Sequence, residues 1–127
     1  MESSLTSVSS INGCVIIPTY NNERTLERVI NEVLEIVPAG HVIVVNDGST
    51  DATPQILKSF EEKVTILVNE VNKGKGYSLR KAFKFAQEKG YANALTIDSD
   101  GQHYPSDIPL LVEAAVNNPG AVIMGSR

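Results

Sequence analysis

The sequence lacks several features that mark particular classes of protein. It has one cysteine, Cys14, which excludes an internal disulfide and fits a reducing compartment. It has no long run of like charges, and its 11 Lys and Arg residues against 15 Asp and Glu residues give a formal net charge of −4. Since this composition provides no dominant basic surface, we expect no nucleic-acid partner.

Long apolar segments are missing as well. No apolar run approaches the roughly 18 residues that a membrane-spanning helix requires. The serine-rich residues 1–12 lack the basic start and the apolar stretch of a signal peptide, and we predict that they form a disordered tail. The sequence therefore predicts a cytoplasmic protein in which residues 13–127 form one domain.

After the tail, short β-branched segments alternate with segments of helical periodicity. Apolar residues recur at helical spacing at Leu26, Val29, Ile30 and Val33, for example. The expected strands are 14–17 (stopped by Pro18), 41–45, 64–68, 94–97 and 121–124. This alternation predicts an α/β fold with an open, mostly parallel, Rossmann-like sheet and helices on both of its faces.

In such a sheet, ligands bind beyond the carboxyl ends of the strands. Four polar segments follow predicted strands, and we expect them to meet along one rim. They are 18–23, 46–51, 69–76 and 98–100.

The most informative segment delivers two carboxylates, Asp98 and Asp100, directly after an apolar strand. Two like charges this close are costly unless a cation lies between them, so the pair predicts a divalent metal site. Gln102 and His103 add an oxygen and an imidazole that could complete the site, although either could instead cap the following helix. Oxygen ligands favour Mg²⁺ or Mn²⁺ over zinc.

Two further carboxylates follow the second predicted strand. We expect Asp51 to cap the next helix. Because residues 48–51 already supply turn and cap chemistry, we expect the Asp47 carboxylate to be free to accept a hydrogen bond from a nucleobase or a sugar hydroxyl.

Segment 72–76, Asn-Lys-Gly-Lys-Gly, places two glycines and two lysines before a helix, where backbone N–H groups attract phosphate. A solvated surface turn is the alternative interpretation. The spacing fits neither the Walker pattern nor the dinucleotide fingerprint, and the loop after the first strand contains no glycine. The pattern therefore argues against NAD.

Together these segments resemble the donor-binding half of a family 2 glycosyltransferase of the GT-A fold. The matching motifs are 16–23, 45–51, 72–76 and 98–103. Within that family, segments 74–76 and 100–103 are most similar to the dolichyl-phosphate and polyprenyl-phosphate sugar transferases. The resemblance implies metal-dependent, inverting transfer of a sugar from a nucleotide-diphosphate sugar to a polyprenyl phosphate or a saccharide.

The resemblance also assigns roles to single residues. The nucleotide-sugar pocket would be lined by Pro18, Tyr20, Glu23, Asp47, Lys75 and Asp98. The metal, Mn²⁺ or Mg²⁺, would be held by Asp98, Asp100 and Gln102, the DXD motif and its neighbour. Arg127 would face the acceptor phosphate, and no catalytic residue is identified.

Family members usually continue past the Gly-Ser-Arg segment that ends this chain. We therefore expect a GT-A domain that is incomplete at its C-terminus and a poor catalyst by itself. The missing part would supply contacts with the acceptor, the catalytic base where the acceptor is a hydroxyl, and contacts with the cytoplasmic face of a membrane. The uncovered sheet edge would favour a homo-oligomer.

Three other interpretations make different demands on the sequence. A non-catalytic nucleotide-sugar-binding module fits the same motifs. A haloacid dehalogenase-like phosphatase carries its Asp-x-Asp pair after the first strand and before a threonine, whereas here the pair follows the fourth strand and precedes Gly101. A sugar nucleotidyltransferase would need a glycine-rich loop directly after the first strand.

Overall fold

The computed structural model describes residues 13–97 and 122–125 of the 127-residue chain. Its strands are β1 (Gly13–Thr19), β2 (Val42–Asp47), β3 (Thr65–Asn69), β4 (Asn93–Ile97) and β5 (Val122–Gly125). Its helices are α1 (Leu26–Leu34), α2 (Thr53–Lys58) and α3 (Lys75–Glu88), with a 3₁₀ turn η2 (Ala39–His41) before β2. The predicted helix from about residue 106 lies outside the described residues, as does the predicted tail.

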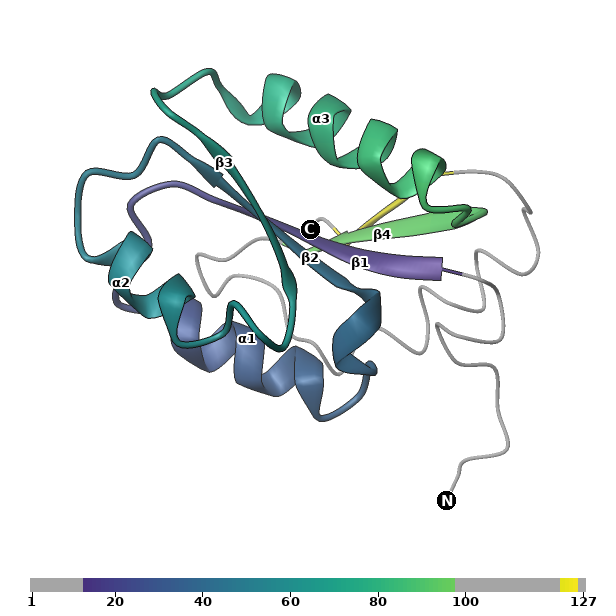
Figure 1. Cartoon of the computed structure of the whole chain (residues 1–127), viewed down its shortest axis with the longest axis horizontal. Helices are drawn as coiled ribbons and strands as arrows, with labels where there is room; N and C mark the ends of the chain where they lie inside the picture. Colours follow the sequence, from purple (N-terminus) through teal and green to yellow (C-terminus); the bar gives the residue numbers. More distant parts are fainter. Residues whose placement is uncertain (1–12, 98–121, 126–127) are drawn as a thin grey trace.

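The strands form one parallel sheet in the order β3-β2-β1-β4-β5. Helices α1 and α2 cover one face of this sheet, and α3 covers the other (Figure 1). The chain builds outward from β1 to β3 and then returns to place β4 on the other side of β1. The order of the strands therefore reverses between β1 and β4, and the α/β prediction is confirmed.

The two faces of the sheet divide the core by strand alternation. Val15 and Ile17 pack with the buried residues of α1 and α2, whereas Cys14 and Ile16 pack with Ala82 of α3. Burial also raises the pKa of the Cys14 thiol to about 12, so this thiol is uncharged at neutral pH. A strand buried on both faces has no polar alternation, which explains why β1 is apolar from Cys14 to Pro18.

Two predicted boundaries at the carboxyl edge of the sheet are wrong. Strand β1 continues through Pro18 to Thr19, in register with Val45 and Asn46 of β2. Strand β2 likewise extends to Asp47, so Asn46 and Asp47 are strand residues and not part of a turn.

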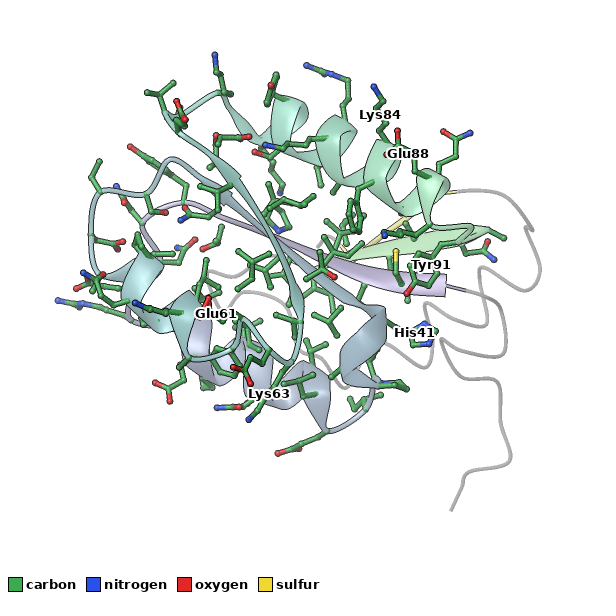
Figure 2. All side chains as sticks on the ribbon, in the orientation of Figure 1. His41, Glu61, Lys63, Lys84, Glu88 and Tyr91 are labelled. Carbon is green, nitrogen blue, oxygen red and sulfur yellow. The ribbon has the colours of Figure 1, made fainter. Side chains whose placement is uncertain are left out.

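At the amino-terminal ends of the strands, two side chains form hydrogen bonds that connect neighbouring segments. His41 Nδ1 lies 2.9 Å from the Gly13 carbonyl oxygen and donates to it, because a carbonyl only accepts. The Tyr91 hydroxyl donates to the Gly40 carbonyl at 2.8 Å, and the two rings lie 5.5 Å apart. Figure 2 shows this pair near the start of β1, far from the strand ends where polar loops gather.

Among the described residues, no helix has the length and apolar character needed to cross a bilayer.

Candidate functional site: the carboxyl rim of the sheet

The loops that follow β1 and β2 are joined by hydrogen bonds. Asn21, whose φ is +52°, donates its backbone N–H to Ser49 Oγ at 3.0 Å. Its side-chain Oδ1 accepts from the backbone N–H of Thr50 at 2.8 Å and of Asp51 at 3.3 Å. One asparagine in the left-handed region therefore holds the second loop through three hydrogen bonds.

Two carboxylates complete this connection in a reciprocal way. Glu23 Oε1 accepts from the backbone N–H of Ala52 at 2.8 Å, and Asp51 Oδ2 accepts from the backbone N–H of Glu23 at 3.2 Å. Asp51 Oδ1 also accepts from the N–H of Thr53, the first residue of α2, at 2.9 Å. We call Asn21, Glu23, Ser49 and Asp51 the loop clasp.

The prediction that Asp51 caps α2 is correct in kind, although it acts from one position before the N-cap residue, Ala52. Burial would raise the pKa of Asp51, but hydrogen bonds from Thr53 and from the Glu23 backbone outweigh burial and lower it. Asp51 therefore binds backbone donors as a carboxylate.

Asp47 is surrounded by donors from its own chain. Its Oδ1 accepts from Asn69 Nδ2 at 2.9 Å and from the backbone N–H of Lys73 at 2.7 Å. Its Oδ2 accepts from Asn72 Nδ2 at 3.1 Å and from the backbone N–H of Gly74 at 2.9 Å. Asp47 is the last residue of β2 and is only 4% exposed. The expectation of a free carboxylate is therefore wrong.

The charge of Asp47 is stabilised by these bonds. Burial would raise the pKa of Asp47, but hydrogen bonds from the Lys73 N–H, the Asn69 amide, the Gly74 N–H and the Ser78 hydroxyl together lower it. The predicted anion-binding segment 72–76 therefore does hold an anion, and that anion is the Asp47 carboxylate.

Asn69, the last residue of β3, links this carboxylate to α3. It stands in register with Asp47, and its Nδ2 also donates to Ser78 Oγ at 3.0 Å. Its Oδ1 accepts from Lys81 Nζ at 2.9 Å, and the same Nζ donates to the Val68 carbonyl at 2.9 Å. We call Asp47, Asn69, Ser78 and Lys81 the buried network.

Sequence reasoning missed Asn69, Ser78 and Lys81. The sequence held one indication of Asn69. If two adjacent parallel strands end in register, polar residues at their last positions lie side by side. Asp47 and Asn69 satisfy this condition. Recognising it required the correct end of β2, which the expected turn at residue 46 concealed.

The other predicted pocket residues are spread along the rim. Pro18 is buried near the end of β1, and Tyr20, the first residue past β1, is 44% exposed. Lys75 is exposed at the first position of α3, and Lys73 Nζ lies 5.8 Å from the centre of the Tyr77 ring. Figure 1 places the loops before α2 and α3 at the same end of the sheet.

The remaining predicted residues lie outside the described part of the chain. These are Asp98, Asp100, Gln102, His103 and Arg127. The structure does place the end of β4 at Ile97, on the strand beside β1 where the strand order reverses. Within residues 13–97 and 122–125, no three His, Cys, Asp or Glu side chains gather in a way that could hold a metal ion.

A cavity of about 720 Å³ opens between α2 and β3 and reaches the rim, where Asn46, Ser49 and Asn69 also line it. Leu57, Lys58 and Glu61 line one side of it, and Ile66 and Val68 line the other. Strand β3 lies at the end of the sheet order, two strands away from β1, so this cavity is not at the switch point.

Comparison with known proteins identifies the family. The model of glycosyl transferase family 2 matches residues 14–127, nearly the whole chain. The chain therefore belongs to glycosyl transferase family 2, and the resemblance of its four motifs to that family is confirmed.

Two relatives indicate the branch of the family that this chain resembles. The chain is 35% identical to UDP-N-acetylglucosamine–dolichyl-phosphate N-acetylglucosaminyltransferase of Methanococcus voltae, over 89% of this chain and 51% of that protein. It is 30% identical to polyprenol monophosphomannose synthase of Mycolicibacterium smegmatis, over 89% of this chain and 44% of that protein. The chain thus spans about half the length of these relatives.

A solved structure supports the fold. Glucosyl-3-phosphoglycerate synthase of Mycobacterium tuberculosis, in complex with Mn²⁺, UDP-glucose and phosphoglyceric acid, superposes with a TM-score of 0.67. The match covers 92% of this chain and 46% of that one at 24% sequence identity. The predicted GT-A architecture is therefore confirmed by structural similarity as well as by topology.

Proposed function

We propose that this chain is the nucleotide-sugar-binding part of a glycosyltransferase that transfers a sugar from a nucleotide-diphosphate sugar to a polyprenyl phosphate. The observation that carries the proposal is the position of β4. It ends beside β1, at the switch point, and the next residue in the sequence is the first carboxylate of the Asp98-Ser99-Asp100 motif. Family membership and the names of the two relatives support the same assignment.

In this proposal, different loops of the rim contact different parts of the nucleotide-sugar donor. Pro18, Tyr20 and Glu23, at and after the end of β1, line the nucleoside side of the pocket. Lys75, at the start of α3, adds positive charge near the diphosphate, where the helix dipole also favours an anion. Asp47 belongs to this pocket through the loop that it holds, because its own carboxylate is occupied.

Asp98, Asp100 and Gln102 would hold the divalent ion, Mn²⁺ or Mg²⁺. Their carboxylate and amide oxygens suit either ion. A bound ion would neutralise the charge that develops on the leaving nucleoside diphosphate. Arg127 is proposed to face the acceptor phosphate.

Transfer would proceed with inversion. An oxygen of the acceptor phosphate forms a bond to the anomeric carbon as the bond from that carbon to the diphosphate oxygen breaks. The electron pair of the broken bond leaves with the nucleoside diphosphate. An acceptor phosphate is already ionised at neutral pH, so this attack needs no base to remove a proton. A lipid acceptor would bring the protein to the cytoplasmic face of a membrane.

Calorimetric titration with uridine, guanosine and thymidine diphosphates, with and without Mn²⁺, tests donor binding. We expect one of them to bind in a Mn²⁺-dependent way. Asp98→Asn and Asp100→Asn should abolish that dependence while the urea unfolding curve stays the same. Unchanged affinity in both variants would overturn the metal assignment.

A second assay separates an enzyme from a binding module. The chain is incubated with a radiolabelled nucleotide sugar and a polyprenyl phosphate, and label in the lipid phase is counted. Label that depends on Asp98 and Asp100 supports transfer. Donor binding without any transfer would show that residues 1–127 bind the donor but do not by themselves form a complete transfer site.

A further inference from the structure

We propose that Asp47 and Asn69 are positioning residues that set the conformation of segment 72–74 and so place Lys75 against the nucleotide diphosphate. This inference rests on the proposed function, in which Lys75 faces the donor. It differs from the role first expected for Asp47, which was direct hydrogen bonding to a nucleobase or a sugar.

The first step concerns the acceptor capacity of Asp47. A carboxylate offers about four lone-pair sites, and those of Asp47 are taken up by donors from Asn69, Asn72, Lys73 and Gly74, with the Ser78 hydroxyl beside them. A donor from a ligand would have to displace one of them. Because the side chain is 4% exposed, that displacement would leave a buried group without a partner.

The second step concerns the shape of the loop. Three of these donors come from the consecutive residues Asn72, Lys73 and Gly74, so one carboxylate sets the path of the backbone there. Gly74 has a φ of +96°, which side-chain-bearing residues rarely adopt. The loop also lies tightly on the turn after β2, since a Cβ on Gly48 would come within 2.4 Å of Asn72 N.

The third step leads to α3. Asn69 donates to Ser78 and accepts from Lys81, both on α3, while Asp47 holds Gly74, the residue before this helix. Lys75 therefore lies between two points that are tied to the ends of β2 and β3. Loosening either tie frees the first turn of α3, and with it the position of the Lys75 amine.

A double-mutant cycle on nucleotide affinity tests this coupling. The variants are Asp47→Asn, Lys75→Ala and both together, titrated with the nucleoside diphosphate that the wild-type chain binds. We expect each single change to weaken binding by about tenfold. When Asp47→Asn is already present, adding Lys75→Ala should lower the nucleotide affinity by less than about twofold, because Lys75 has already lost its position.

Lys84→Ala is the matched control for Lys75→Ala. Figure 2 shows Lys84 on the outer side of the same helix, pointing away from the sheet. This change should leave the affinity unaltered in both backgrounds. If Asp47→Asn and Lys75→Ala multiply as independent effects, or if Asp47→Asn binds as the wild type does, Asp47 is not a positioning residue and the inference is overturned.

Amide hydrogen exchange supplies a readout that needs no nucleotide. In the wild-type chain the N–H groups of Lys73 and Gly74 should be protected, and Asn69→Ala should speed their exchange by at least about tenfold. The amides of β1 should keep their protection, which shows that the variant is folded. Exchange of Lys73 and Gly74 that is already fast in the wild type would overturn the inference.

Ser78→Ala is a milder variant in case Asn69→Ala fails to fold. It removes one partner of Asn69 and should speed exchange of the Gly74 amide less than Asn69→Ala does. The experiment distinguishes failure of the proposed function from failure of the positioning role. If the wild-type chain binds no nucleoside diphosphate, both proposals are overturned. If the wild type binds and the cycle shows no coupling, only the positioning role falls.

Discussion

The loop clasp and the buried network lie on the same rim and use the same chemistry, yet they differ in access to water. In each, a carboxylate accepts backbone N–H groups from a loop more than 20 residues away. Asn21 and Glu23 of the clasp are exposed, whereas Asp47 and Asn69 of the network are each 4% exposed. Water can therefore replace a lost partner in the clasp more readily than around Asp47 and Asn69.

This difference teaches how one rim combines a stiff side with an adaptable side. Loss of a clasp bond costs little, so the loops after β1 and β2 can adjust to a ligand. Loss of a hydrogen bond to Asp47 or Asn69 leaves a buried polar group without a partner, which costs free energy. The loop before α3 therefore keeps its shape. A pocket built between them would hold the phosphate side firmly and accommodate the nucleoside.

Asp47→Ala should have the largest effect on stability. It leaves the Asn69 amide and the N–H groups of Lys73 and Gly74 without their acceptor, and we expect the free energy of unfolding to fall by about 3 kcal/mol. Asp51→Ala, the equivalent change in the clasp, should cost about 1 kcal/mol. Urea unfolding followed by circular dichroism measures both, and equal losses would contradict the distinction between network and clasp.

Gly48→Ala tests how tightly the loop before α3 lies on the end of β2. The new Cβ would come 2.4 Å from both Asn72 N and Val71 C, at a φ of +70°. We expect a loss of about 2 kcal/mol in the same unfolding assay.

Gly90→Ala separates the two causes of that loss. Gly90 has a similar φ of +89° but nothing within 4 Å of its Cβ position. The change should cost about 1 kcal/mol, from backbone strain alone. A loss as large as that of Gly48→Ala would show that contact with the loop adds nothing.

Acid should weaken both the network and the clasp. The pKa values of Asp47 and Asp51 are both lowered by folding, so each contributes stability that is present above the unfolded value of about 4. That stability is lost as the pH falls through the lower folded values. Unfolding measured from pH 7 to pH 2 should show a slope that Asp47→Asn and Asp51→Asn each reduce, and an unchanged slope in either variant would contradict this expectation.

Glu23→Gln should have the smallest effect. The amide oxygen can still accept from the Ala52 N–H, and the site is open to water, so we expect a change of less than about 0.5 kcal/mol. Nucleotide titration of this variant is more informative than its stability. If Glu23 lines the nucleoside pocket, affinity falls while stability does not, and a change in stability alone would make Glu23 a clasp residue only.

Much of the fold was predictable because local patterns carry it. The helical spacing of Leu26, Val29, Ile30 and Val33 identified α1, and all four residues are buried. The apolar runs identified the strands, and the four motifs identified the family. The ends of β1 and β2 were less predictable, because proline and asparagine usually end strands. Here the pairing between β1 and β2 extends both strands past these residues.

The sequence by itself determined the α/β architecture, the family and the polar segments that gather at one rim, because periodicity and motif spacing are local properties of the chain. Only the tertiary structure decided what each polar side chain does there. Asp47 meets Asn69, which is 22 residues later, through strand register, and meets segment 72–74 through the turn that follows. A carboxylate that its own chain surrounds with donors cannot be distinguished, in the sequence alone, from one that waits for a ligand, because the partners are brought together only by folding.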